Sequence, residues 1–250
     1  AEEDGSGAAA VLADPRFATI RPDYGFALHN LPGLPLGQAV LEPGPANCAS
    51  VGMRLRLVGR TSHAAEPHLA ISPAGALVAL VPGLQALAGG DWPKPGFRLV
   101  TLTHLRMGEP CFGITPGAAE LYATLRCLQD ADMAALKAEA VALAEGVAAA
   151  EGLALEIDWQ DDFAASQNDP EATELLRKAL AAAGVRRIPG QPMRASEDFG
   201  RFGAVARTAM FWFGAGEAHP PLHAPDYDFP DALIGPGMAV FDQVLRELLG

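Results

Sequence analysis

Two adjacent carboxylates, Glu2 and Glu3, open the chain in the run AEEDGSGAA. Neighbouring carboxylates that both ionise repel each other unless a positive charge lies close by, and a bound metal ion is one source of that charge. Gly5 and Gly7 permit a tight turn into a run of small residues, so the pair is expected at the mouth of a helix. A solvated acidic helix start explains the same residues, so other parts of the chain must decide between the two interpretations.

Two histidines add candidate ligands for the same kind of ion. His29 lies in FALHNLPGLPLG, which predicts a strand that runs into a Pro/Gly loop, and His223 lies in the loop sequence HPPLHAPDYDFPD. Carboxylate oxygen and imidazole nitrogen suit zinc and similar divalent cations. Because loops at the strand ends of an open α/β sheet meet in one crevice, Glu3, His29 and His223 are predicted to converge there. A single loop histidine is more often structural, and no H-E-x-x-H or C-x-x-C spacing marks a metal site by itself.

The elements that must position these residues form an α/β pattern with a self-contained block in the middle. The block reads strand, helix, strand, strand, helix, strand, which is the β-α-β-β-α-β order of a ferredoxin-like sheet with both helices on one face. Strands and helices of similar texture stand before and after it. We therefore predict a discontinuous α/β domain, residues 1–48 plus 164–250, interrupted by an α+β domain at residues 49–163.

Composition excludes several classes of function. The chain has 250 residues, a net charge of -12 and no basic patch, which argues against binding to nucleic acid or an anionic membrane surface. No apolar run is long enough to span a bilayer, and no signal peptide is evident. Three widely spaced cysteines, Cys48, Cys111 and Cys127, predict no disulfide framework but small buried side chains in a cytoplasmic protein.

Six sequence motifs together resemble a known family. They are AEEDGSGA, ALHNLPGLP, GRTSHAAEPHLAISP, ELYATLR, SEDF and PLHAPDYDFPD, and they follow in family order along nearly the whole chain. Each is weak alone, but the set resembles the di-metal aminoacylase and carboxypeptidase family, in the branch of hippurate hydrolase and the auxin-conjugate amidohydrolases. The resemblance implies a catalytic α/β domain interrupted by a lid domain that also forms a homodimer. Its expected substrate is a small acyl amino acid or peptide.

The resemblance also implies roles for individual residues. Glu2 matches the general base, and Glu3, His29 and His223 match ligands of two divalent ions, which are zinc, manganese, cobalt or nickel. His63 matches a lid histidine that reaches the partner subunit's site and steadies the oxyanion. The residues expected near the substrate are Arg126, which would grip its carboxylate, with Ser196 and Glu197 of the SEDF motif.

The chain departs from the family pattern in two places. The family's first metal motif, a cysteine and histidine in a Gly/His-rich loop, lies upstream of the paired carboxylates, so we expect that further residues precede Ala1 in the natural protein. In the middle domain, Gly113 of GITPG stands where the family has an asparagine. His104 and Arg106 are candidates to replace that amide, although strand residues facing solvent explain them equally well.

Simpler readings accompany the remaining motifs. Ser62 or Thr61, and likewise the SEDF segment, could begin capped helices, and residues 210–213 are most simply a buried strand. The leading hypothesis is a metal-dependent hydrolase of N-acyl amino acids or small peptides. The alternative is a catalytically incomplete remnant that acts as a dimeric small-molecule binding module. A serine or cysteine hydrolase has little support because no G-x-S-x-G motif occurs.

Overall fold

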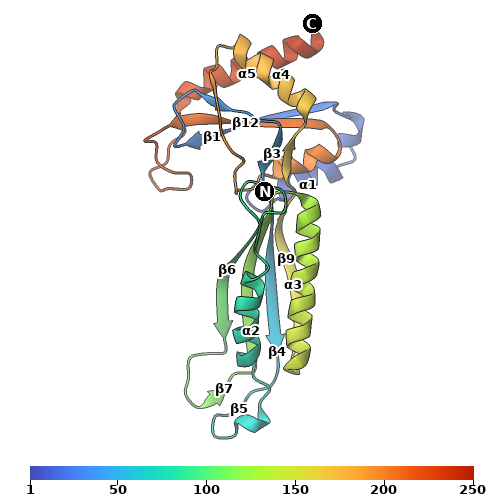
Figure 1. Ribbon diagram of the computed structural model, residues 1–250, viewed down its shortest axis with the longest axis vertical. Coiled ribbons are helices and arrows are strands. Elements are labelled where there is room, and N and C mark those ends of the chain that lie inside the picture. Colours follow the sequence, from blue (N-terminus) through green and yellow to red (C-terminus); the bar gives the residue numbers. More distant parts are fainter. The chain divides into compact units, whose positions relative to one another are not determined.

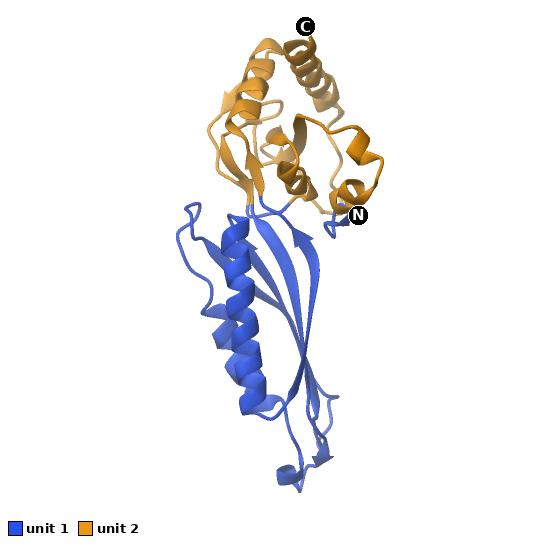
Figure 2. Ribbon diagram, turned by 90° about the vertical axis from the view of Figure 1, so that its right-hand side faces the viewer, with its two compact units in different colours: residues 1–6, 48–165, 194–196 blue, residues 7–47, 166–193, 197–250 orange.

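The computed structural model describes residues 1–250, which form two compact units. Unit 1 comprises residues 1–6, 48–165 and 194–196, and unit 2 comprises residues 7–47, 166–193 and 197–250 (Figure 2). This division differs from the predicted one because two short segments, at the start of the chain and at 194–196, have their contacts within unit 1.

Unit 1 is built on a four-stranded antiparallel sheet with the order β6-β8-β4-β9. Its strands are β4 (Ala49–Val58), β6 (Arg98–Met107), β8 (Ala118–Cys127) and β9 (Ala154–Phe163). Helices α2 (Ala74–Gln85) and α3 (Asp130–Ala150) complete the β4-α2-β6-β8-α3-β9 order. The predicted ferredoxin-like arrangement of strands and helices within a mixed α/β fold is therefore confirmed.

The sheet of unit 1 has one buried and one polar face. Residues alternate along β8, so that Leu121 and Leu125 are buried while Glu120 and Tyr122 are half-buried on the other side. Leucines of β4, α2 and α3 join the buried cluster, and both helices cover the same face of the sheet (Figure 2). The opposite face of this sheet is free of helices (Figure 2), and it carries the half-buried polar side chains of β8.

Unit 2 contains a sheet of order β1-β12-β2-β11, of which the two long strands, β1 (Tyr24–Pro32) and β12 (Arg207–Gly216), run parallel. The two-residue strands β2 (Ala39–Val40) and β11 (Arg187–Ile188) extend it. Helices α4 (Pro170–Ala182) and α5 (Ile234–Leu249) pack on the face formed by Phe211 and Phe213 (Figure 1). Met210 and Trp212 lie in a second cluster, so β12 is buried on both sides as predicted.

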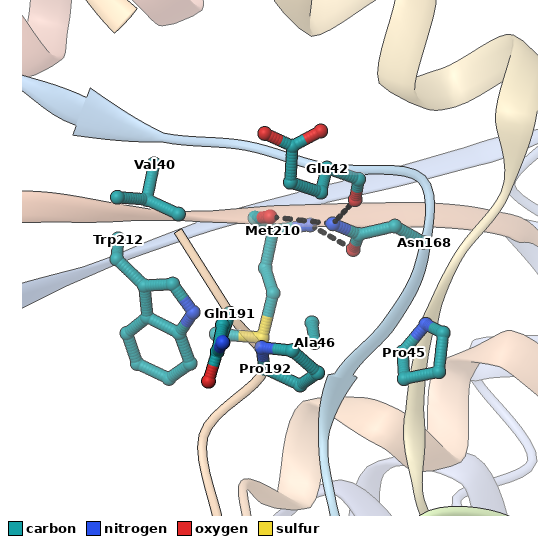
Figure 3. A pocket seen from close by; sticks show the side chains of 9 residues that line it. All are labelled: Val40, Glu42, Pro45, Ala46, Asn168, Gln191, Pro192, Met210 and Trp212. Atoms are coloured by element: carbon teal, nitrogen blue, oxygen red, sulfur yellow. Dashed lines mark hydrogen bonds between the residues drawn. The ribbon is translucent and has the colours of Figure 1, made fainter. Parts of the chain in front are cut away.

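A short ladder between β3 (Gly44–Asn47) and β10 (Ser166–Asn168) adjoins this sheet. The buried Asn168 side chain bonds like a strand backbone: Nδ2 donates to the carbonyls of Glu42 and Met210, each at 2.9 Å, and Oδ1 accepts from the Met210 amide at 2.8 Å (Figure 3). These bonds fix β10 against the middle of β12. The side chain thereby supplies the hydrogen bonds that a neighbouring strand would otherwise make.

The remaining elements are short. They are α1 (Ser6–Ala13), β5 (Ser62–His63), β7 (Ile114–Thr115) and the 3₁₀ helices η1 (Phe17–Thr19), η2 (Pro67–Leu69), η3 (Asp198–Ala204) and η4 (Asp231–Leu233). No helix is long and apolar enough to cross a membrane. Cys48 and Cys127 are buried free thiols as predicted, but the prediction for Cys111 is wrong, because it is exposed.

Candidate functional site

The paired carboxylates lie in a turn at the start of the chain. Glu2 and Glu3 are exposed, and the Gly5 amide donates to the Glu2 carbonyl at 2.9 Å, which closes the turn directly before α1. Gly5 has φ +73, and a Cβ there would lie 2.6 Å from the Asp162 carbonyl oxygen, so only glycine fits. The sequence therefore forms a tight glycine turn that presents both carboxylates at the helix mouth.

His29 is held on β1 in a defined tautomer. Its Nδ1 lies 2.6 Å from the Asn30 carbonyl oxygen. A carbonyl only accepts hydrogen bonds, so Nδ1 carries the proton and Nε2 of the neutral ring has a free lone pair. A backbone carbonyl on the far ring nitrogen is the usual support of a metal-binding histidine. The local geometry therefore prepares Nε2 to bind a cation.

Glu197 faces that lone pair. Its Oε1 is 3.7 Å from His29 Nε2, and the two side chains are only 16% and 31% exposed. A lone pair and a carboxylate repel each other unless a proton or cation lies between them. A nitrogen and an oxygen bound tetrahedrally to one zinc ion would be roughly 3.4 Å apart, close to this separation. The pair therefore fits one edge of a metal site.

The loop that carries His223 is tied back to the strand of His29. The Asn30 side-chain amide donates to the Tyr227 hydroxyl, and the Tyr227 ring packs edge-on against His219 at 5.3 Å. His219 Nε2 in turn lies 2.7 Å from the Asp228 carbonyl oxygen. This anchoring was missed by the sequence analysis, although His219 and Tyr227 stand in the same loop as His223.

His223 itself is exposed, with φ 64. A non-glycine residue with a positive φ is strained, and such strain is concentrated at functional positions. No group of three His, Cys, Asp or Glu side chains able to hold a metal ion is found. Glu3 belongs to unit 1 and both histidines belong to unit 2, so the convergence of these three ligands stays a prediction.

Arg126 and Ser196 come together in unit 1. Arg126 Nη1 donates to the Ser196 Oγ at 3.0 Å and to the Arg194 carbonyl oxygen at 2.9 Å. Burial lowers the pKa of the Arg126 guanidinium, and no carboxylate pairs with it. A guanidinium that keeps donors without a counter-ion is suited to an acidic ligand.

His63 lies on β5 and is exposed. Its Nδ1 accepts a hydrogen bond from the Ala65 amide at 3.0 Å, so the neutral ring carries its proton on Nε2. The prediction that Ser62 or Thr61 caps a helix is wrong, because Ser62 pairs with Thr115 in the β5–β7 ladder and α2 begins only at Ala74. His63 is thus an exposed hydrogen-bond donor, the opposite tautomer to His29.

Two other predicted residues have different surroundings. His104 is exposed on β6 and packs edge-on against Tyr122 at 5.1 Å. The capped-helix reading of SEDF is wrong, since Asp198 opens η3 without a side-chain cap and its Oδ2 instead accepts from the Ala8 amide at 2.7 Å. Asp198 therefore supports α1 from a distant part of the sequence.

The small pocket in unit 2 is not a ligand site. It lies beside Asn168, Met210 and Trp212 (Figure 3) and has room of about 10 Å³. That is roughly the volume one water molecule occupies. The pocket is therefore too small for a substrate, and the features that bear chemistry are those at His29 and at Arg126.

Curated relatives match this chain along nearly all of its own length. An N-acetyldiaminopimelate deacetylase of Exiguobacterium sibiricum is 25% identical over 99% of the chain, and one of a Geobacillus species is 28% identical over 100%. The chain spans 66% and 64% of the lengths of these two relatives, which is less than two thirds of each.

Solved structures share the fold. The YXEP protein of Bacillus subtilis, described as a dinuclear metal-binding peptidase of the M20 family, matches with a TM-score of 0.78 at 22% identity, over 100% of this chain and 63% of its own. The aminobenzoyl-glutamate utilization protein of Klebsiella pneumoniae matches with a TM-score of 0.71 at 20% identity, over 89% and 54%. The model of peptidase family M20/M25/M40 matches residues 1–247. This chain therefore belongs to peptidase family M20/M25/M40.

Proposed function

We propose that this protein is a metal-dependent amidohydrolase that cleaves the amide of N-acyl amino acids or small peptides. The observation that carries the proposal is the opposite tautomers of His29 and His63, one prepared to bind a cation and the other to donate a hydrogen bond. Metal-dependent hydrolysis of an amide uses both groups, because the cation activates water and the donor stabilises the developing oxyanion. Membership of the family and the deacetylase relatives support the same reaction.

In this proposal Glu3, His29 and His223 are metal ligands for two divalent ions, which are zinc, manganese, cobalt or nickel. When bound, the ions supply Lewis-acid chemistry that activates water and polarises the carbonyl. The Asn30 carbonyl holds the His29 ring in its binding tautomer. The Asn30–Tyr227 hydrogen bond holds the His223 loop at the end of β1.

Glu2 acts as the general base. It takes a proton from the attacking water and then passes it to the departing amine, so that one carboxylate serves both half-reactions. Its exposed position in the Gly5 turn leaves it accessible to water. His63 donates from Nε2 to the carbonyl oxygen as negative charge develops there, and therefore strengthens binding mainly in the transition state.

The substrate is held by its carboxylate. Arg126 retains donors beyond those directed to Arg194 and Ser196, and a guanidinium pairs with a carboxylate in a bidentate fashion. Ser196, Glu197 and His104 complete the proposed contacts with the substrate. The specific hippurate hydrolase and auxin-conjugate amidohydrolase activities are included as the finer form of the proposal, and the motif set supports them.

A homodimer through unit 1, acting as a lid, is also proposed. Strand β6 is an edge strand with unpaired backbone donors and acceptors, which a second copy of the same strand can satisfy. A groove of about 390 Å³ runs beside it, lined by apolar side chains of α2 and β6. Val78 in that groove is 75% exposed and Leu105 is 49% exposed. A cytoplasmic location is proposed on the evidence of three free cysteines.

Metal content and turnover test the proposal together. Glu2→Gln is expected to keep its metal and lose activity by about 10²–10⁴-fold on N-acetyldiaminopimelate or hippurate, the range that a general base contributes. The matched control is Glu217→Gln, an exposed carboxylate without a side-chain partner, which is expected to behave as wild type. A wild-type chain without metal or turnover would contradict the proposal and favour the binding module.

A further inference from the structure

The turn that carries Glu2 packs on one peptide group of β9. The Gly5 amide closes the turn onto the Glu2 carbonyl at 2.9 Å. A Cβ on Gly5 would meet the Asp162 carbonyl oxygen at 2.6 Å and its carbonyl carbon at 3.3 Å, so the two backbones are in direct contact. Both segments belong to unit 1. The position of the Glu2 turn therefore depends on the Asp162 peptide.

Strand β9 is irregular at that peptide. The β4–β9 register shifts between Ser50 and Gly52, where β9 has one residue more than β4, and this makes a β-bulge. Asp161 lies within the bulge and has φ 49, a left-handed conformation that few residues other than glycine adopt. A bulge bends its strand and changes the direction of the groups beside it. The backbone of Asp161 therefore determines how the following Asp162 peptide is directed.

Helix α3 holds the chain on both sides of the bulge. Lys137 Nζ lies 4.4 Å from the centre of the Trp159 ring and 3.5 Å from Asp162 Oδ2. Beyond the bulge, the Ala165 amide donates to Asp130 Oδ1 at 2.8 Å. A strained residue persists only where its surroundings fix it, and such residues are concentrated at functional positions. The bulge is thus a fixed support for the Glu2 turn.

We propose that Asp161 is a positioning residue, whose left-handed backbone holds the bulge in the form that places the Glu2 carboxylate for proton transfer. The inference rests on the proposed function, in which Glu2 is the general base. A base must lie within hydrogen-bond reach of its proton, and a misplacement of about 1 Å costs about 10²-fold in rate. The Asp161 side chain is exposed, so the backbone and not the carboxylate supplies the support.

The test separates the backbone of Asp161 from its charge. Asp161→Gly and Asp161→Asn remove the charge but still adopt a positive φ, so kcat on N-acetyldiaminopimelate or hippurate is expected to stay within about twofold of wild type. Asp161→Val disfavours that φ and is expected to lower kcat roughly tenfold or more with little change in KM. Asp158→Val, at an exposed and regularly paired position of β9, is the control and is expected to keep wild-type kcat.

A double variant shows whether Asp161 acts through Glu2. If it does, Asp161→Val causes no further loss of kcat in the Glu2→Gln background, whereas a general weakening of the fold lowers kcat in both backgrounds. Should Asp161→Val fail to fold, Asp161→Ala imposes a milder strain at the same φ and is expected to give a smaller loss that is likewise absent in Glu2→Gln.

Equal kcat in the valine, alanine and glycine variants, or the same loss with and without Glu2, would overturn the role of Asp161. If wild type hydrolyses neither compound, the proposed function fails, and hydrogen exchange of the Gly5 amide decides the support separately. Exchange about tenfold faster in Asp161→Val than in wild type, but unchanged in Asp161→Gly and Asp158→Val, would uphold it. Equal exchange in all four proteins would refute it.

Discussion

The strands of unit 1 have one buried face and one polar face, whereas β12 of unit 2 is buried on both. In unit 1 the free face carries Glu120, Tyr122 and Arg126 of β8, and Arg54 of β4 pairs with Tyr122 across the two strands. In unit 2 Phe211 and Phe213 pack on one side of β12 and Met210 and Trp212 on the other. An exposed face can present side chains to a ligand, while a strand buried on both faces mainly holds its neighbours in place.

The largest expected loss of stability comes from removing a large side chain from the core of unit 2. Phe213 is fully buried and packs edge-on against Phe211 at 5.7 Å. Phe213→Ala is expected to lower the free energy of unfolding by about 3–5 kcal/mol, measured by urea denaturation with tryptophan fluorescence. Phe112→Ala, at a fully exposed position in unit 1, is the control and is expected to change nothing. A loss below about 1 kcal/mol for Phe213→Ala would contradict the two-sided burial of β12.

A somewhat smaller loss of stability is expected where the Asn168 side chain joins β10 to β12. Asn168→Ala removes three hydrogen bonds and leaves the Met210 amide and two carbonyls unpaired in the interior. We expect a loss of about 2–4 kcal/mol in the free energy of unfolding. Gln160→Ala, an exposed amide on β9, is the matched control. Similar stability of both variants would mean that the bonds of Asn168 are replaced by water.

The cysteines, which all lie in unit 1, report on that unit alone. Burial raises the pKa of Cys48 to about 11 and that of Cys127 to about 12, from ordinary values near 9. Folding therefore favours the protonated thiols: this contribution to stability is complete below about pH 9 and is lost as the pH rises towards 11–12. At pH 8 a thiol reagent should label the exposed Cys111 quickly and the other two only on unfolding. Rapid labelling of all three would show that unit 1 opens readily.

The smallest effect is expected on the polar face of unit 1. Arg54 donates to Glu120 at 2.8 Å, and this hydrogen bond lowers the pKa of the carboxyl. Its contribution is present at neutral pH and is lost as the pH falls through the lowered pKa. Because the pair is half-buried and still reached by solvent and salt, the thermal midpoint of Glu120→Gln should stay close to that of wild type. A large drop would show that this face is buried against something else in solution.

Local sequence patterns were sufficient to predict the type and order of the long strands and helices. The alternation in β4, β6 and β8 and the helix-forming run of α3 are strong local signals, so their type and order were predicted. The two-residue strands β2, β5, β7 and β11 were missed, because so few residues carry no period. Their pairing depends on partners far along the chain, as Ser62 with Thr115 shows.

The candidate site was also only partly predictable, because its supporting contacts join residues far apart in the chain. The types of Glu3, His29 and His223 suggested metal binding, but nothing in the sequence gives the tautomer of a ring, which depends on the Asn30 carbonyl for His29 and on the Ala65 amide for His63. The contact between Asn30 and Tyr227 joins residues that are 197 positions apart. The stacking of Arg194 on Trp92 is equally non-local. Residue types can therefore nominate a site, whereas its support is decided by the tertiary fold.

The amide of Asn168 has a consequence for how this protein ages. Slow hydrolysis of that side chain would release ammonia and leave an aspartate whose oxygen faces the carbonyls of Glu42 and Met210. The donating amide would become a negatively charged oxygen that faces two carbonyl oxygens. Their repulsion would separate β10 from β12. In stored samples, the unfolded fraction of unit 2 should therefore rise with the fraction of protein deamidated at Asn168. A peptide map of aged protein would measure that deamidated fraction.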